Sequence, residues 1–314
     1  MHPARTAAAF STAQVPSAER LRAWEAHNAA ALIALRCRTP RGEEFRARED
    51  NLPLGRVHLA RVRTTAHVVE RPAELIERQP TGSVALYVSL RGDALFQQAG
   101  RRQTIRPGDL LVCDADGHFV RGFGHGLDEL AVRVERRALA GVVRGPTPEE
   151  PLIVRKSERN PYGRALARLV GRAVGVEDAA RPDERTIVDL VSVLVSDGAT
   201  RPHIVHRALA CARIEDRLRD PRLSAPEVAD AVGISVRQLT RVFAETGTTF
   251  PRYVLGRRLE LAYGLLTGPG AAVTSTAAVA TSCGFSSAPH FSQTFHARFG
   301  ITAGELRRTA AKRD

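Results

Sequence analysis

The spacing of apolar residues changes along the chain and predicts two kinds of structure in its first half. Residues 21–35 place apolar side chains at helical spacing, so we expect a short amphipathic helix there, after an opening segment of residues 1–20 that we expect to be mobile. From residue 45 to 134 the apolar runs are short and separated by turn residues. We expect strands near residues 57–62, 84–90, 94–97, 110–113 and 130–134, and such a series of short strands predicts an antiparallel β-sandwich or barrel.

Beyond residue 136 the apolar positions return to helical spacing. Apolar residues at positions 166, 169, 170, 173 and 174 form the stripe of a helix that packs on one side. Residues 187–195 are mostly apolar and ambiguous by composition, but Pro182 followed by two acidic residues predicts the start of a helix there. The polar segment 196–202, which contains glycine and proline, is then the expected linker to the last part of the chain.

A helix-turn-helix pattern follows the linker. Such a unit needs a small residue where the helices cross, a glycine with positive φ in the turn, and apolar residues that hold the two helices together. Ala229, Gly233 and Leu239 supply these three features. Ser224 with Glu227 predicts a capping box for the first helix, and Ser235 with Gln238 predicts one for the second, which should begin at Val236.

The second helix of this unit should present Arg237, Gln238, Thr240 and Arg241 outward, because Leu239 and the apolar pair at 242–243 face inward. Arginine can bind guanine and glutamine can bind adenine in the major groove of DNA. The alternative for the two arginines is a solvated charge, and the alternative for Gln238 is a side chain occupied by capping.

A second pattern of the same kind lies further along the chain. Ala280, Gly284, Phe291 and Phe295 take the equivalent places, with one more residue in the turn. Ser286 or Ser287 would cap the helix that follows. The candidates for its exposed face are Ala288, His290, Gln293 and Thr294, and Pro289 fits its first turn but removes an amide that could hold a phosphate. His290 has an alternative role as a capping or solvated imidazole.

The two turn glycines lie 51 residues apart in the sequence, and a helical stripe between residues 253 and 266 connects the two units. One connecting helix would hold both units in a single rigid body. Two recognition helices held about 34 Å apart would enter successive major grooves on one face of DNA.

Composition agrees with a polyanionic partner. The chain has a formal net charge of +12, and residues 203–314 carry 15 lysines and arginines against 9 acidic residues. The four cysteines are widely separated and form no CxxC motif, so we expect buried apolar residues and neither a zinc site nor disulfides. No apolar run is long enough to cross a membrane and no signal peptide is evident, so we expect a cytoplasmic protein.

These residues resemble the DNA-binding domain of the AraC/XylS family of transcription regulators. The resemblance runs from about residue 214 to 308, and its most specific part is GFSSAPHFSQTFHARFGITAGELRR, residues 284–308. It implies base contacts from Arg237, Thr240 and Arg241 in the first unit and from the start of the second recognition helix, through Ser287, Ala288, Pro289, His290 and Gln293. Ala288 and Pro289 stand where the family often has polar residues, and Gln293 stands where arginine is frequent. Specificity in the second half-site is therefore expected to be weaker, or to depend on DNA shape.

The first half of the chain is similar to the AraC-type ligand-binding domains, which are built on a cupin-like β-barrel. The similarity rests on Trp24, the strand rhythm and the turn at residues 106–109. Metal-binding cupins place two histidines one residue apart, whereas residues 86–139 contain only His118 and His125, seven residues apart, so we expect no metal and no cofactor.

The predicted architecture is therefore an α+β multidomain chain. We expect a cupin-like sensing domain at 21–140, a helical dimerisation or linker region at 141–202 and a DNA-binding domain at 203–314. The expected function is sequence-specific transcription regulation, with activation favoured by the resemblance, and the expected partners are promoter DNA, RNA polymerase, a second copy of the chain and a small-molecule effector in the barrel. In the cell we expect the protein at the nucleoid.

Two other function classes fit part of the sequence. A cupin-type enzyme with a DNA-binding appendage would need a metal-ligand or acid–base constellation, and the sequence shows no such motif, so no enzyme activity is expected. An architectural DNA binder without sequence preference would explain the charge but not two capped recognition helices.

Overall fold

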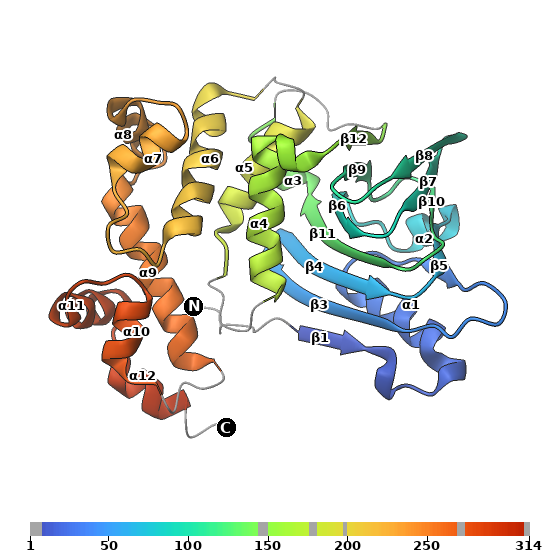
Figure 1. Cartoon of the computed structure of the whole chain (residues 1–314), viewed down its shortest axis with the longest axis horizontal. Helices are drawn as coiled ribbons and strands as arrows, with labels where there is room; N and C mark the ends of the chain where they lie inside the picture. The colour runs from blue at the N-terminus through green and yellow to red at the C-terminus, as the bar shows by residue number, and fades with distance from the viewer. Residues whose placement is uncertain (1–7, 144–149, 176–180, 197–199, 269–273, 311–314) are drawn as a thin grey trace. The chain divides into compact units, whose positions relative to one another are not determined.

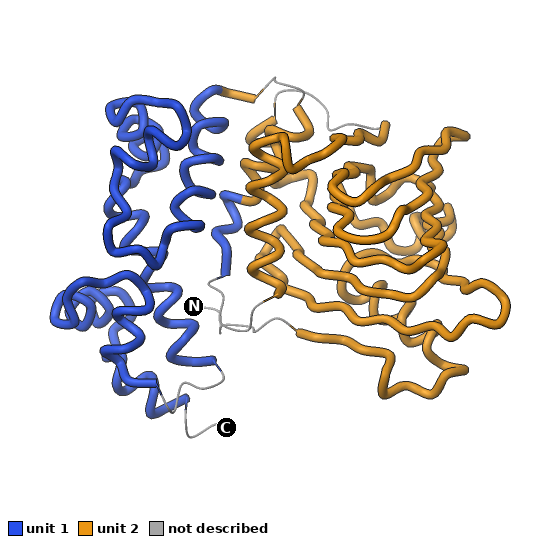
Figure 2. Tube along the Cα trace, in the orientation of Figure 1, with its two compact units in different colours: residues 1–6, 176–186, 202–314 blue, residues 7–175, 187–201 orange. Residues whose placement is uncertain are grey.

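The chain divides into two compact units. The computed structural model describes residues 8–143, 150–175, 181–196, 200–268 and 274–310 (Figure 1). Unit 1 comprises residues 1–6, 176–186 and 202–314, and unit 2 comprises residues 7–175 and 187–201 (Figure 2). The β-rich first part and the helical last part confirm the predicted α+β architecture.

Unit 2 is built on two antiparallel sheets. One has the strand order β1-β3-β4-β11-β6-β9-β12 and the other the order β2-β5-β10-β7-β8. The strands are β1 (Ala8–Ser11), β2 (Arg36–Arg38), β3 (Ala47–Leu54), β4 (Val57–Thr64), β5 (His67–Arg71), β6 (Ser83–Arg91), β7 (Ala94–Gln98), β8 (Arg101–Ile105), β9 (Leu110–Asp114), β10 (Phe119–Phe123), β11 (Leu127–Glu135) and β12 (Leu152–Val154). The five predicted strands are confirmed as β4, β6, β7, β9 and β11, and the others were not predicted.

The described part of the opening segment, from residue 8, forms regular structure against the larger sheet. β1 pairs with β3, and two short 3-10 turns follow, η1 (Thr12–Gln14) and η2 (Ser17–Glu19). The buried Thr12 hydroxyl exchanges hydrogen bonds with the backbone of Ala47 on β3, which fixes this segment to the sheet. Residues 1–7 lie outside the described residues.

The core of unit 2 lies between the two sheets. The strand register places Asn51, Ala60, Ala131 and Tyr87 side by side on neighbouring strands of the larger sheet. Trp24 belongs to the same buried cluster and comes from helix α1 (Arg20–Ala31). The predicted helix at 21–35 therefore exists but ends earlier, because residues 36–38 form β2.

The remaining helices of this half are α2 (Ala73–Arg78), α3 (Arg136–Ala140), α4 (Pro161–Gly175) and α5 (Glu184–Val195), with the 3-10 turn η3 (Ser157–Arg159) before α4. The predicted stripe of α4 is confirmed, since all five of its apolar positions are buried, and α4 packs on β3, β4 and β11. α5 begins where Pro182 predicted, and the Asp183 carboxylate accepts the amide of Thr186 (3.1 Å). Of the expected helical region 141–202, most described residues group with unit 2, whereas 181–186 group with unit 1. Of the expected linker, residues 197–199 lie outside the described residues.

The described part of unit 1 contains a series of helices, of which α9 is the longest. They are α6 (Pro202–Arg217), α7 (Ala225–Ala231), α8 (Val236–Ala244), α9 (Phe250–Thr267), α10 (Thr276–Ser282), α11 (Ala288–Phe299) and α12 (Ala303–Ala310). Side chains from all seven helices share one apolar core. None of the described helices combines the length and the apolar character that a membrane span requires.

The cysteines are free thiols. Cys113, Cys211 and Cys283 are buried as predicted, and Cys37 is half-buried. Burial raises the pKa of Cys37 and Cys113 to about 12, so both stay protonated near neutral pH.

Candidate nucleic-acid interface

α7 and α8 form the first helix-turn-helix unit, and α8 begins at Val236 as predicted. Gly233 in the turn has a φ of 71°, which a residue with a side chain rarely adopts. Ser235 and Gln238 form the predicted capping box. The box predicted at Ser224 forms only in part: its hydroxyl accepts the amide of Glu227, but the Glu227 carboxylate accepts from Arg213 (2.6 Å).

The four predicted contact residues of α8, Arg237, Gln238, Thr240 and Arg241, are all exposed. Gln238 Oε1 accepts from the Ser235 amide (3.0 Å), so capping occupies its carbonyl. Thr240 Oγ1 donates to the Val236 carbonyl (3.0 Å). Among the described residues neither Arg237 nor Arg241 has an acidic partner within ion-pair distance, so both guanidinium groups are available to a ligand.

α10 and α11 form the second unit. Ser287 caps α11 by accepting the His290 amide (3.4 Å), which decides between the two predicted capping serines. Phe291 and Phe295 are buried, and the turn is one residue longer than in the first unit, both as predicted. Gly284 has a φ of 82°, and a Cβ added there would lie 2.8 Å from the Leu218 carbonyl oxygen, so this position requires glycine for two reasons.

The exposed face of α11 carries little charge. The exposed residues there include all those predicted from the second unit: Ser287, Ala288, Pro289, His290 and Gln293. Thr294, also expected outward, is half-buried, and its hydroxyl donates to the His290 carbonyl (2.7 Å). Arg298 lies in the last turn of α11 and pairs with Glu260 on α9 (2.6 Å).

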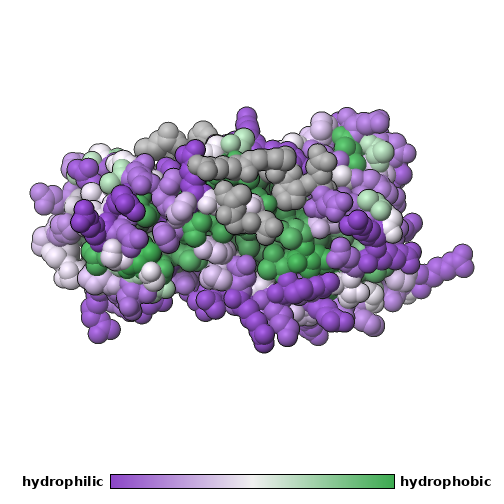
Figure 3. Space-filling model, turned by 90° about the horizontal axis from the view of Figure 1, so that it is seen from above, coloured by the Kyte–Doolittle hydropathy of each residue, from purple (hydrophilic) through white to green (hydrophobic). Residues whose placement is uncertain are grey.

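Both recognition helices rest on α9. In Figure 1, α8 and α11 lie along the same side of unit 1, with α9 between them. Arg258 on α9 donates to the carbonyls of Leu218 (3.0 Å) and Asp220 (2.7 Å), which closes the end of α6. The face of the molecule in Figure 3 is mainly hydrophilic (purple), with smaller apolar areas (green).

A buried charge network joins the helices of unit 1. Arg257 on α9 contacts Glu215 on α6, Glu260 on α9 and the carbonyl of Arg181, and Glu260 also holds Arg298 on α11. Burial alone would lower the pKa of Arg257, but Glu215 holds it well above the ordinary value, so the guanidinium stays charged. The sequence analysis did not find this role of Arg257, because Glu215 and the Arg181 carbonyl lie far from it in the sequence.

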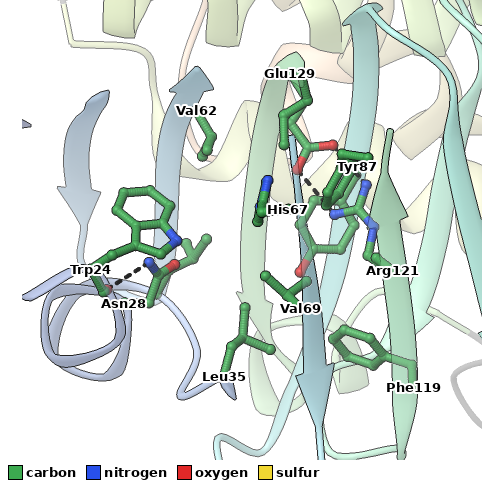
Figure 4. Close-up of a pocket in the computed structure, with 13 residues that line it drawn as sticks. Trp24, Asn28, Leu35, Val62, His67, Val69, Tyr87, Phe119, Arg121 and Glu129 are labelled. Carbon is green, nitrogen blue, oxygen red and sulfur yellow. Dashed lines mark hydrogen bonds and ion pairs between the residues drawn. The ribbon is translucent and has the colours of Figure 1, made fainter. Parts of the chain in front are cut away.

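In unit 2 the described residues of α1 and of both sheets line a small pocket (Figure 4). Its polar wall groups include Arg121, Glu129 and His67, which the sequence did not single out. His118 and His125 are both exposed. Within the described ranges no three His, Cys, Asp or Glu side chains gather as metal ligands.

Two family models match the chain. The AraC-binding-like domain matches residues 24–220, and the helix-turn-helix domain matches residues 228–309.

Similar proteins include two transcriptional activators. RhrA of Rhizobium meliloti (strain 1021) is 40% identical over 127 residues, which cover 39% of this chain and 40% of that protein. NphR of a Rhodococcus species is 27% identical over 286 residues, which cover 85% of this chain and 82% of that protein. The crystal structure of the AraC-like transcriptional activator CuxR aligns with 82% of this chain and 96% of its own, at 20% identity and a TM-score of 0.45.

The AraC-binding-like model alone covers more than half of the chain, and the helix-turn-helix model covers the two units described above. The chain therefore belongs to the AraC family of DNA-binding transcription regulators.

Proposed function

We propose that this regulator binds a specific promoter site through α8 and α11, each in its own major groove, and that Arg237 and Arg241 make the main base contacts. The observation that carries this proposal is the exposed face of α8, where two arginines have no acidic partner among the described residues. Arginine donates two parallel hydrogen bonds to guanine, a contact worth about 1–3 kcal/mol of discrimination.

The second half-site should be read less stringently. α11 offers His290 and Gln293 as hydrogen-bonding groups, and no arginine on the same exposed face. Ala288 and Pro289 can contact a thymine methyl group or exclude a base by shape. We therefore expect strong base preference at the α8 half-site and tolerance of substitutions at the α11 half-site.

Footprinting on the DNA upstream of the protein's own gene tests this proposal. Two protected patches on one face of the duplex are expected, with centres about 10 base pairs apart. Specific duplex should compete for the protein far better than random duplex of the same length. Equal competition by the specific and the random duplex would show that the protein binds DNA without sequence preference, which contradicts the proposal.

Regulation should come from unit 2. A small-molecule effector in the pocket would bias the chain between arrangements that do and do not bind DNA.

Activation through RNA polymerase is the proposed outcome, because the relatives RhrA and NphR are named transcriptional activators. We propose a homodimer that acts at the nucleoid in the cytoplasm. Transcription in vitro with and without the protein tests activation, and sedimentation tests the dimer.

A further inference from the structure

The five-stranded sheet of unit 2 carries apolar residues at the centre of its outer face. β5, β10 and β7 are its three middle strands (Figure 1), and their register aligns Val68, Gly122 and Leu95 in one row. Val120 lies two residues before Gly122 and therefore shares this face. Leu95 is 43% exposed, and Val68 and Val120 are half-buried. This apolar centre is open to solvent, whereas the opposite face of the sheet covers the core.

Gly122 interrupts the row of side chains although the fold does not require a glycine there. Its φ lies outside the left-handed region that favours glycine. A Cβ added at Gly122 would lie 3.8 Å from Leu95 Cβ and 3.8 Å from Val68 Cγ2, which is ordinary van der Waals contact. Glycine inside a strand weakens the strand and often marks a place where another chain approaches closely. The missing side chain therefore leaves room for a partner above β10.

Arginines stand on both edge strands of the same face. On β2 the register places Arg36 and Arg38 on this face. On β8, Arg102 lies opposite Gln97, which shares the face of Leu95 because it lies two residues further along β7. All three arginines are exposed. Among the described residues Arg38 and Arg102 have no acidic partner within ion-pair distance, so anionic groups of a partner can pair with them.

Acidic residues are fewer on this face. Glu70 is the only one among its strand residues, and it lies opposite Arg36, with His118 Nε2 3.5 Å from its Oε1. Arg36 also lies 3.5 Å from Glu74 of α2, and both of those side chains are mostly exposed. Exposed ion pairs contribute little, so Glu74 does not hold Arg36 strongly. The face is therefore basic along both edges, with the apolar centre between them.

The width of the apolar centre matches an α-helix. Neighbouring strands lie about 4.7–4.9 Å apart, so the three middle strands span about 10 Å. An α-helix with its side chains is about 10–12 Å wide, and an apolar sheet face is commonly buried against a helix. A helix laid along β10 would cover the apolar centre, and its two flanks would lie above the arginines of β2 and β8.

We propose that the outer face of this sheet docks an amphipathic α-helix of a partner protein, with an apolar stripe along β10 and acidic residues on both flanks. Charge complementarity selects this occupant. A second copy of the chain with its strands aligned fits less well, because both edge strands are basic and would face the basic edges of the other copy. The docking requires no DNA and goes beyond the proposed function.

Fluorescence anisotropy with a labelled synthetic helix tests this docking on the full-length protein. The probe is a stapled peptide of about 16 residues, about 24 Å long as a helix, with a leucine stripe flanked by glutamates. Its control carries a lysine in place of each glutamate. The acidic peptide should show saturable binding, and the lysine peptide should bind at least about tenfold more weakly. Excess duplex DNA should not displace the acidic peptide, because its site does not include the arginines of α8.

Variants locate the site. Leu95→Asp should weaken binding of the acidic peptide at least about tenfold, whereas Leu90→Asp, at a leucine that is 42% exposed on the other sheet, should bind like the wild type. Gly122→Leu closes the gap in the row and should weaken binding to a similar extent, and it serves as the test if Leu95→Asp fails to fold. The double variant Arg38→Glu with Arg102→Glu should prefer the lysine peptide. Circular dichroism melting checks the fold of each variant.

Four results would overturn this inference. The first is no saturable binding of the acidic peptide up to about 1 mM, and the second is equal binding of the lysine peptide. The third is unchanged binding in a folded Leu95→Asp or Gly122→Leu variant, or displacement by duplex DNA, since either would place the peptide elsewhere. The fourth is a dimer in sedimentation that Leu95→Asp dissociates, which would show that a second copy covers this face. Specific promoter binding without any peptide binding would refute the docking alone.

Discussion

The turn glycine of the second helix-turn-helix unit offers a sharp test of the architecture of unit 1. Gly284→Ala adds a Cβ at a residue whose φ is 82°, 2.8 Å from the Leu218 carbonyl oxygen and 3.0 Å from Arg258 Nε. Arg258 Nε donates to that same carbonyl, so the methyl group must disturb the bond that closes α6. Gly233→Ala is the matched control, because its φ is 71° but nothing lies within 4 Å of the added Cβ.

The expected losses differ for this reason. The left-handed conformation alone costs a residue with a side chain about 1–2 kcal/mol, and both variants incur this cost. Overpacking against a fixed backbone adds about 1–3 kcal/mol, and only Gly284→Ala incurs that cost. We therefore expect a loss of about 1–2 kcal/mol in the free energy of unfolding for Gly233→Ala and about 2–5 kcal/mol for Gly284→Ala.

Urea unfolding of the full-length variants measures both values. Helical circular dichroism follows unit 1 together with the helices of unit 2, and the fluorescence of Trp24, the single tryptophan, follows unit 2 alone. The circular dichroism transition should shift, and the fluorescence transition should stay within about 0.5 kcal/mol of the wild type. Equal losses in the two variants, or a larger loss at Gly233, would refute the close approach of the second turn to the end of α6.

Three further predictions follow from single contacts. Gln238→Ala should lower the stability seen in thermal melts by about 0.5–1 kcal/mol through the lost capping box, and it should hardly change the ratio of affinities for cognate and mismatched duplexes. Unchanged stability together with a lower affinity ratio would count against the capping role. Arg257→Met should lower the free energy of unfolding by about 3–5 kcal/mol, because it removes the cation that pairs with the buried Glu215 carboxylate. In the same urea assay Arg298→Ala, at a partly exposed ion pair, should cost under about 1 kcal/mol. Similar costs for the two variants would contradict the burial of Arg257 and Glu215. Because burial lowers the pKa of His67 and of His58 from 6.5 to about 4, the unfolded chain binds these protons first, so unit 2 should lose stability as the pH falls from about 6.5 to 4. His67→Asn should weaken this dependence, followed by Trp24 fluorescence, while His58 keeps the rest, and an unchanged dependence would contradict the burial of the neutral His67 ring.

The helical half of the fold was predictable because its signals are local. Capping serines, turn glycines and the spacing of Phe291 and Phe295 lie within a few residues of the helices that they define. The start of α8 at Val236 and the exposure of its two arginines were both predicted for this reason.

The β-rich half was predictable only in outline. Strands such as β8, with the sequence RRQTI, and β3, with AREDNLPL, carry many polar residues and give no alternating pattern. These strands are defined by their pairing in the sheet, β8 with β7 and β3 with β1 and β4, which the pattern of polar and apolar residues does not show. The pocket was not predicted either, since Arg121 on β10 and Glu129 on β11 belong to different sheets and meet only when the two sheets pack together.

The contact between Arg241 and the bases of a specific site is the central claim, and affinity ratios test it most directly. The ratio of affinities for cognate and random duplexes is measured for the wild type, for Arg241→Ala and for Arg222→Ala, whose side chain is 90% exposed in the segment before α7. We expect Arg241→Ala to lower this ratio by a factor that corresponds to about 1–3 kcal/mol, whereas Arg222→Ala should leave it unchanged. An unchanged ratio in Arg241→Ala, with the protein folded, would contradict the account.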